Sequence, residues 1–254
     1  MGEIKSTNKI SILLLVIFIL LSGFLILPGC NKEGVCISST GPIKREPRKI
    51  SDFDSLDVRG NVNVFLHQDT INRVMVEAGE NLLPGIVTEV ENRQLTINNF
   101  NTCNWVRSYS KPINVYVSVK NLIKIYYLSS GDITATDTLR SDSLHVEAWG
   151  GCGVIDLLMK TGSGQFILQM GTVDYKLRGI CPITSIYAGD YGLFDCRNLK
   201  SSYTYVTNKG SNDCYVYSNY FLEATIGSIG NIYYTGNPLV IKTHIEGTGQ
   251  LIPF

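Results

Sequence analysis

The sequence has no excess of charge of either sign. Lys plus Arg and Asp plus Glu both number 22, which gives a formal net charge of zero at pH 7. A protein that binds nucleic acid uses a basic surface to neutralise the phosphate backbone, and no such surplus is available here. The balance therefore argues against a nucleic-acid partner.

Recognisable catalytic motifs are also lacking. The 3 histidines each lie in an alternating run that is typical of an exposed strand: His67, His145 and His244. No His-Glu-x-x-His, Gly-x-Ser-x-Gly or Gly-x-x-x-x-Gly-Lys pattern occurs, which argues against metalloproteases, nucleophile-elbow hydrolases and P-loop proteins. No Cys-x-x-Cys spacing supports zinc or thioredoxin-like chemistry. We therefore predict a protein that is not an enzyme, with no catalytic, cofactor-binding or metal-binding residues.

Runs of Ala, Leu, Glu and Lys that favour helices are few. The chain instead contains 24 glycines and 14 tyrosines among its 254 residues, a composition that favours strands and turns. An all-β domain can occupy most of a chain of this length, so we expect a single core domain.

The N-terminus reads as a targeting segment. Lys5 and Lys9 precede the uncharged stretch 10–27, and "LPGC" ending at Cys30 resembles a bacterial lipobox. We predict a lipoprotein signal peptide over 1–29, with Cys30 as the lipidated residue that anchors the protein to the outer membrane. An uncleaved single-span anchor is the alternative. Residues 30–49 are polar and aperiodic, which predicts a flexible tether to a domain over 50–254.

The second half of the sequence is periodic. Glycines recur about every 20 residues, at Gly131, Gly151, Gly171, Gly192, Gly210, Gly230 and Gly249. Short alternating runs such as 144–149, 202–206 and 239–245 lie between them and predict half-buried strands. We therefore expect a β-solenoid in which each rung stacks on the next about 4.8 Å away. Residues 50–120 show the 20-residue glycine repeat less clearly and are expected to form the first rungs or a capping sheet.

Aligning the rungs on their glycines places carboxylates and thiols in rows. Asp174, Asp195 and Asp213 each follow an anchor glycine by three residues, and Cys196 and Cys214 follow theirs by four. Neighbouring strand residues face opposite ways, so the aspartates would point outward and the cysteines inward. The cysteines would stack as an unbonded interior pair or form a disulfide. The aspartates provide the material for a polysaccharide-acting enzyme, although aspartate is also common in turns.

Tyrosine is concentrated in the repeats. Its ring offers apolar area with a hydroxyl at the tip, so a face of stacked tyrosines is suited to hold a sugar or a protein surface. The opposing interpretation is that many of them pack the core, because tyrosine is a good strand former. The candidate ligand surface comprises Tyr203, Tyr205, Tyr215, Tyr217, Tyr233 and Tyr234.

The order of motifs resembles a known family. The segments are "FDSLDVRGNVNVFLHQ" (53–68), "VMVEAGENLLPGIVTEVENRQLTI" (74–97), "INVYVSVKNLIKIYYLSSGDI" (113–133) and "IEGTGQLIPF" (245–254). They resemble the putative auto-transporter adhesin head domain of the GIN type, a bacterial secreted or lipoprotein family. The resemblance implies a right-handed parallel β-helix-like domain and a non-enzymatic, adhesin-like module that binds an extracellular glycan or protein. A structural envelope protein is the alternative.

Overall fold

The structure is a computed structural model that describes residues 39–101 and 112–254. The described residues form strands, one short 3-10 helix at Leu83–Gly85 and no α-helix. No helix in this part of the chain is long and apolar enough to cross a membrane. The predicted signal peptide, the lipidation at Cys30 and the first part of the predicted tether lie outside the described residues.

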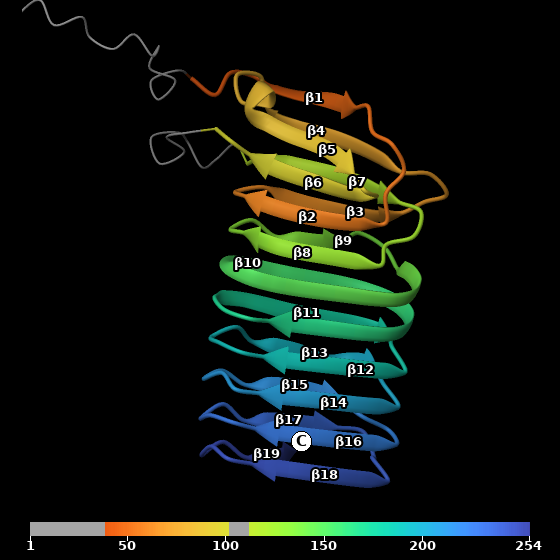
Figure 1. Ribbon diagram of the computed structural model, residues 1–254, viewed down its shortest axis with the longest axis vertical. Coiled ribbons are helices and arrows are strands. Elements are labelled where there is room, and N and C mark those ends of the chain that lie inside the picture. The colour runs from red at the N-terminus through yellow and green to blue at the C-terminus, as the bar shows by residue number, and fades with distance from the viewer. Residues whose placement is uncertain (1–38, 102–111) are drawn as a thin grey trace, which may run out of the picture. The chain divides into compact units, whose positions relative to one another are not determined.

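The strands stack into two faces that enclose the core (Figure 1). Face A runs in the order β5 (Ile86–Glu91), β6 (Gln94–Asn99), β2 (Ser55–Gly60), β8 (Lys124–Ser129), β10, β12 (Ile183–Ala188), β14 (Tyr203–Asn208), β16 (Phe221–Ile226) and β18 (Val240–Ile245). The long strand β10 (Leu139–Leu168) bends from one face to the other and back.

Face B completes each rung. Its order is β1 (Ile43–Arg48), β4 (Arg73–Gly79), β7 (Asn114–Val119), β3 (Asn63–Gln68), β9 (Ile133–Ala135), β10, β11 (Thr172–Ile180), β13 (Phe194–Lys200), β15 (Cys214–Tyr217), β17 (Ile232–Thr235) and β19 (Leu251–Pro253).

Parallel pairing repeats at the spacing that the glycines predict. On face A, Ser163 aligns with Ile183, and Ile183 aligns with Tyr203. The next steps, from Tyr203 to Phe221 and on to Val240, are only slightly shorter. The predicted all-β solenoid, with one rung for each glycine interval, is confirmed.

The core consists of inward-facing columns that alternate with outward residues along the strands. On face B one column contains Ile155, Tyr175, Phe194, Cys214 and Ile232, all of them buried. The rings of Tyr175 and Phe194 stack with centroids 4.4 Å apart. Such residues remove apolar area from water at every rung, which is the main source of stability in a repeat fold.

Residues 69–101 and 112–121 form the cap expected at the N-terminal end. β4 pairs antiparallel with β7, and β5 pairs antiparallel with β6. β6 and β8 lie on opposite sides of β2, so the chain leaves the first rung, builds the cap and returns. The cap covers a strand edge that would otherwise be exposed.

The predicted boundary between tether and domain at residue 49 is wrong, because the folded domain begins earlier. Residues 43–48 form β1, which pairs antiparallel with β4 over its whole length. Lys44 and Arg45 are ion-paired with Glu80 and Glu77 across this ladder, each at 2.5 Å. The polar, charged composition that suggested a linker is the composition of an exposed edge strand.

Glycine recurs about every 20 residues for a steric reason. A Cβ on Gly230 would lie 2.1 Å from the carbonyl oxygen of Asn212, and one on Gly210 would lie 2.0 Å from that of Asp190. Real Cβ atoms do not approach backbone oxygens so closely, so the corner of each rung sits against the corner of the previous one only where glycine occurs.

A second corner is closed by small polar side chains. Thr161, Cys181 and Ser201 occupy the same place in three successive rungs, and each donates a hydrogen bond to the carbonyl two positions further on, at 3.1, 3.1 and 3.0 Å. The thiol of Cys181 therefore takes the place of the hydroxyl that its neighbours use. Its role is to satisfy a buried carbonyl at the turn.

Candidate binding surface

The rings of two predicted tyrosines stack on the outer side of face B. Inward Cys214 and Ile232 are followed by outward Tyr215 and Tyr233, which alternation and parallel register place side by side. The two rings are nearly parallel, at 11°, with centroids 4.8 Å apart. Phe254 closes the group edge-on, 5.8 Å from Tyr215 and 6.3 Å from Tyr233.

A β-bulge brings charge to these rings. The pairing of β11 with β13 shifts between Lys176 and Arg178, so β13 holds one extra residue, and Arg197 lies on this irregular stretch. Its guanidinium carbon is 4.3 Å from the centroid of Tyr215, and its Nε donates to Asp195 Oδ1 at 2.7 Å. Bulges re-aim side chains and are frequent at functional sites. We call Asp195, Arg197, Tyr215, Tyr233 and Phe254 the face B cluster.

Tyr217 lies beside this cluster on the same face. The ammonium of Lys200 sits 4.0 Å from the centroid of its ring. Cations over aromatic faces at exposed positions interact by about 0.5–1 kcal/mol. This corner of face B thus combines flat apolar rings, two cations and one carboxylate.

A separate aromatic group lies on face A. Tyr203 and Tyr205 project outward from β14 and contact Tyr220 and Phe221, with centroid distances of 5.3 Å (Tyr203–Tyr220) and 5.6 Å (Tyr205–Phe221). Each of the two tyrosines is 40% exposed. We call these four residues the face A cluster.

The six predicted tyrosines therefore do not share one surface. Tyr203 and Tyr205 belong to face A, whereas Tyr215, Tyr217 and Tyr233 belong to face B. Tyr234 packs against the core in the same column as Val216, so its ring is not part of either outer surface. The adjacent pair in the sequence necessarily places one ring inside and one outside.

The predicted aspartate row is wrong. Asp195 aligns with Lys176 and Tyr215, whereas Asp174 lies earlier on β11 and Asp213 precedes β15. Asp174 accepts a hydrogen bond from the Leu193 backbone amide at 2.8 Å, and Asp213 accepts one from the Asn231 amide at 2.9 Å. Both carboxylates therefore cap the start of the next rung, as aspartate does in turns.

The cysteines do not stack as predicted either. Cys214 lies beside Phe194, and both Cys196 and Cys214 are buried free thiols. Burial raises the pKa of each thiol above its ordinary range, so both are neutral and behave as small apolar side chains.

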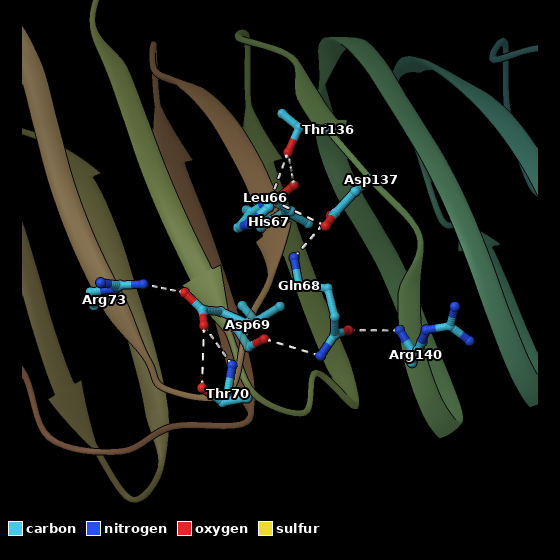
Figure 2. A network of polar contacts seen from close by, with 10 residues as sticks. Leu66, His67, Gln68, Asp69, Thr70, Arg73, Thr136, Asp137 and Arg140 are labelled. Atoms are coloured by element: carbon cyan, nitrogen blue, oxygen red, sulfur yellow. Dashed lines mark hydrogen bonds and ion pairs between the residues drawn. The ribbon is translucent and has the colours of Figure 1, made fainter.

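Polar clusters elsewhere are engaged by the fold. At the end of β3, His67 Nδ1 lies 3.2 Å from Asp137, whose other oxygen accepts the Gln68 amide at 2.9 Å (Figure 2). The hydroxyl of Thr136 donates to the Leu66 carbonyl at 2.9 Å and lies 3.5 Å from His67 Nδ1, so this network ties neighbouring turns together. Among the described residues, no group of three His, Cys, Asp or Glu side chains is arranged to hold a metal.

A groove of about 540 Å³ lies at the capped end, beside β1, β4 and β7. Three cations line it, Arg48, Lys49 and Arg73. Arg48 is ion-paired with Glu46 at 3.1 Å, and Arg73 is ion-paired with Asp69. Tyr116 is the one aromatic residue among those that line the groove, whereas the face B cluster brings three aromatic rings together, which makes that cluster the stronger candidate.

Sequence reasoning missed Arg197, Lys200 and Phe254. The spacing of Asp195 and Arg197 in an alternating run carries no signal for a bulge. Their proximity to the tyrosines follows only from the register of β13 on β15 and of β17 on β19. Lys200 and Phe254 lie at or just beyond the ends of strands, where the alternating pattern gives no direction.

Comparison with known proteins agrees with the architecture. A putative adhesin from Bacteroides fragilis is 19% identical, with a TM-score of 0.77 over 84% of this chain and 97% of that one. A putative lipid binding protein from Parabacteroides distasonis is 17% identical, with a TM-score of 0.66 over 85% and 98%. A putative adhesin from the same organism is 18% identical, with a TM-score of 0.64 over 84% and 98%.

The TM-scores show a shared fold at these low sequence identities. No curated protein matches the sequence. Residues 52–238 match the family described as putative auto-transporter adhesin, head GIN domain. That match spans most of the described residues, including both aromatic clusters except Phe254. The chain belongs to the family of putative auto-transporter adhesin head GIN domains.

Proposed function

We propose that this protein is a non-enzymatic, adhesin-like binding module that holds a glycan on the face B cluster. The observation that carries the proposal is the bulge that sets Arg197 over Tyr215, beside the stacked ring of Tyr233. Flat rings accept the apolar face of a sugar, while the guanidinium and the carboxylate of Asp195 offer donors and acceptors to its hydroxyls. A protein surface is the alternative ligand.

The proposal includes a place in the cell envelope. The family description supports an extracellular or envelope-associated protein, and the lipobox-like "LPGC" ending at Cys30 supports a lipid anchor in the outer membrane. Several acyl chains hold a protein to a membrane durably. Replacing Cys30 with alanine is expected to release the protein from the membrane fraction. A Cys30→Ala protein that stays in the membranes contradicts the lipid anchor and favours an uncleaved span.

A polysaccharide-acting enzyme is the less supported alternative. Glycosidases use two carboxylates about 5–9.5 Å apart on either side of the bond that is cleaved. The proposed row does not exist, because Asp174 and Asp213 each bind a backbone amide and Asp195 pairs with Arg197. A purely structural envelope protein is the remaining alternative.

A glycan array probed with the full chain separates these functions. We expect retention of at least one glycan without release of product. Tyr215→Ala and Tyr233→Ala should each weaken that binding by about 30-fold, the effect of truncating a central aromatic anchor. Tyr203→Ala, on the opposite face, is the matched control and should bind as the unaltered protein does.

Each other outcome points elsewhere. Product release supports the enzyme, and silence on glycans together with silence on cell-surface proteins supports a structural role. Loss of binding in Tyr203→Ala, with Tyr215→Ala and Tyr233→Ala unaffected, moves the site to face A. Circular dichroism of each variant shows whether the fold is retained.

A further inference from the structure

The last strand of face A presents an open edge with apolar residues beside it. β18 pairs with β16 and with no other strand in the part of the chain that the structure describes (Figure 1). Ile241 and Ile245 are 42% and 52% exposed, although they continue the columns of Leu222 and Ile226, which are fully buried. Apolar side chains that belong to the core are thus left in contact with water.

The other end of the solenoid is protected. β1 carries Lys44, Arg45, Glu46 and Arg48 and contains Pro47. Charge and proline are the usual means by which proteins prevent pairing at a strand edge. β18 has Lys242 as its one formally charged residue and no proline. β18 therefore lacks the protection that β1 has, and it leaves two apolar residues of the core columns beside a backbone edge that no described strand covers.

The backbone of β18 is ready to accept another strand. Val240 and Glu246 donate their amides to Tyr220 and Ile226 of the β16 region, at 3.0 and 2.9 Å. Alternation then directs the amides and carbonyls of residues 241, 243 and 245 away from β16. These are the groups that a further strand would bind.

We propose that β18 pairs antiparallel with β18 of a second copy, about a two-fold axis at Thr243. In this register Ile241 faces the partner's Ile245, and the two Thr243 side chains face each other, so all the inward residues continue the apolar core. Every outward-directed amide and carbonyl of the strand finds a partner. On the outer side Lys242 faces the partner's His244.

Neighbouring registers are poorer. A slip that centres the pair on Lys242 places two ammonium groups directly opposite each other, which is destabilising. A slip that centres it on His244 sets Ile241 against the partner's Gly247 and leaves the apolar side chain without contact. A register whose two-fold axis falls between two residues would pair inward side chains with outward ones, and the pleat of the sheet excludes it. The pairing about Thr243 is thus the self-complementary one.

The symmetry limits the assembly to a dimer. Each copy uses its single free β18 edge, so the contact is isologous and closed. Pro253 lacks an amide proton, which weakens the edge of β19 on face B as a second pairing site. Because the axis is normal to the sheet, face B of both copies lies on the same side. The inference does not depend on the proposed glycan binding.

Cysteine cross-linking tests the register in cells that produce the full chain. Thr243→Cys, with Cys36, Cys103 and Cys152 changed to serine, should give a covalent dimer on mild oxidation. Hydrogen-bonded antiparallel partners have Cα atoms about 5.5 Å apart, within the range that a disulfide spans. Lys242→Cys is the matched control and should give no covalent dimer, because residue 242 faces residue 244 of the partner.

A charge exchange tests the same register without covalent chemistry. Ile241→Lys should raise the dimer dissociation constant of the full chain by about 100-fold, because two ammonium groups are buried against the partner's Ile245. Adding Ile245→Asp should restore dimerisation, because each lysine then faces an aspartate of the partner. The two positions lie four residues apart on one strand, so the lysine and the aspartate of a single copy do not meet.

The outcomes are decisive. A full chain that sediments as a monomer at micromolar concentration overturns the proposal, as does a dimer that forms equally well in the Ile241→Lys variant. Cross-linking of Lys242→Cys in preference to Thr243→Cys also overturns it. Circular dichroism identifies a variant that fails to fold, in which case the cross-linking pair alone decides. Glycan retention by a monomer would leave the proposed function intact.

Discussion

Asn208 provides a quantitative test of how the corners of the solenoid are held. It is fully buried, although its neighbours in the same column, Ala188 and Ile226, are apolar. Its side-chain nitrogen donates to the carbonyls of Asn212 and Asn231 at 2.9 and 3.2 Å, and its oxygen accepts the Gly210 amide at 3.0 Å. One side chain thus makes three hydrogen bonds to the backbone of two rungs.

Replacement of Asn208 by leucine keeps the branching of the side chain and suits an apolar column. Three hydrogen bonds at about 1 kcal/mol each are lost, and the buried Gly210 amide keeps no acceptor, so we expect a loss of about 3 kcal/mol in the free energy of unfolding. For a domain of this size that lowers Tm by about 6–12 °C.

The measurement is thermal and guanidinium unfolding of the full chain, followed by far-ultraviolet circular dichroism. Asn219→Leu is the control, because Asn219 is exposed in a turn of the next rung. An Asn208→Leu protein within about 0.5 kcal/mol of the unaltered one, the range of ordinary surface substitutions, would refute the reasoning. It would mean that water satisfies the carbonyls of Asn212 and Asn231 as well as the side-chain amide of Asn208 does.

Other expected outcomes concern the corners, the thiols and pH. Gly230→Ala should destabilise the protein by about 1–3 kcal/mol or prevent folding, because the new methyl group would clash with the Asn212 carbonyl. Gly227→Ala is the control in the same unfolding assay. It should be nearly neutral, because its methyl group comes close only to the flexible side chain of Lys209. Cys181→Ser should change stability by less than about 1 kcal/mol, because a hydroxyl suits that corner, while Cys214→Ser buries a hydroxyl among apolar side chains and should cost about 1–3 kcal/mol. Burial raises the pKa of the thiols of Cys181, Cys196 and Cys214. Above the unfolded pKa of about 8.5 only the unfolded chain loses these protons, so the free energy of unfolding falls by up to about 1.4 kcal/mol per pH unit per thiol. Below that pH the contribution of the thiols is complete. Unfolding measured from pH 8 to pH 10 should show this decline, and alanine at two of the three positions should reduce it; a flat profile would contradict the shifted pKa values.

The period of the solenoid could be predicted from sequence, but the register could not. Glycine recurs because the corners of neighbouring rungs touch, so the spacing is visible without a structure. The interval from Gly192 to Gly210 is shorter by two positions than the interval from Phe194 to Cys214, which pair directly on the strands that follow. Two extra residues in a turn are enough to shift every strand position that is counted from the glycine.

That shift explains why the candidate site was only partly predicted. Tyr215 and Tyr233 belong to the predicted set of tyrosines, and each follows an inward residue on its strand, a direction that depends only on local alternation. Their neighbour Asp195 was instead placed in a row with Asp174 and Asp213, which depends on the lengths of turns. The bulge at Arg197 depends on the pairing of two strands and leaves no pattern in either one.

The outward column of face B makes the solenoid a spacer whose length changes only in whole steps. Thr134, Asp156, Lys176, Asp195, Tyr215 and Tyr233 follow one another from rung to rung. Five steps of about 4.8 Å set Tyr233 about 24 Å from Thr134 along the stack. Duplication or deletion of one rung would move the aromatic cluster away from the capped end, or toward it, by one such step and leave its chemistry unchanged. Reach and recognition are therefore separate traits in this architecture, and each is open to change without the other.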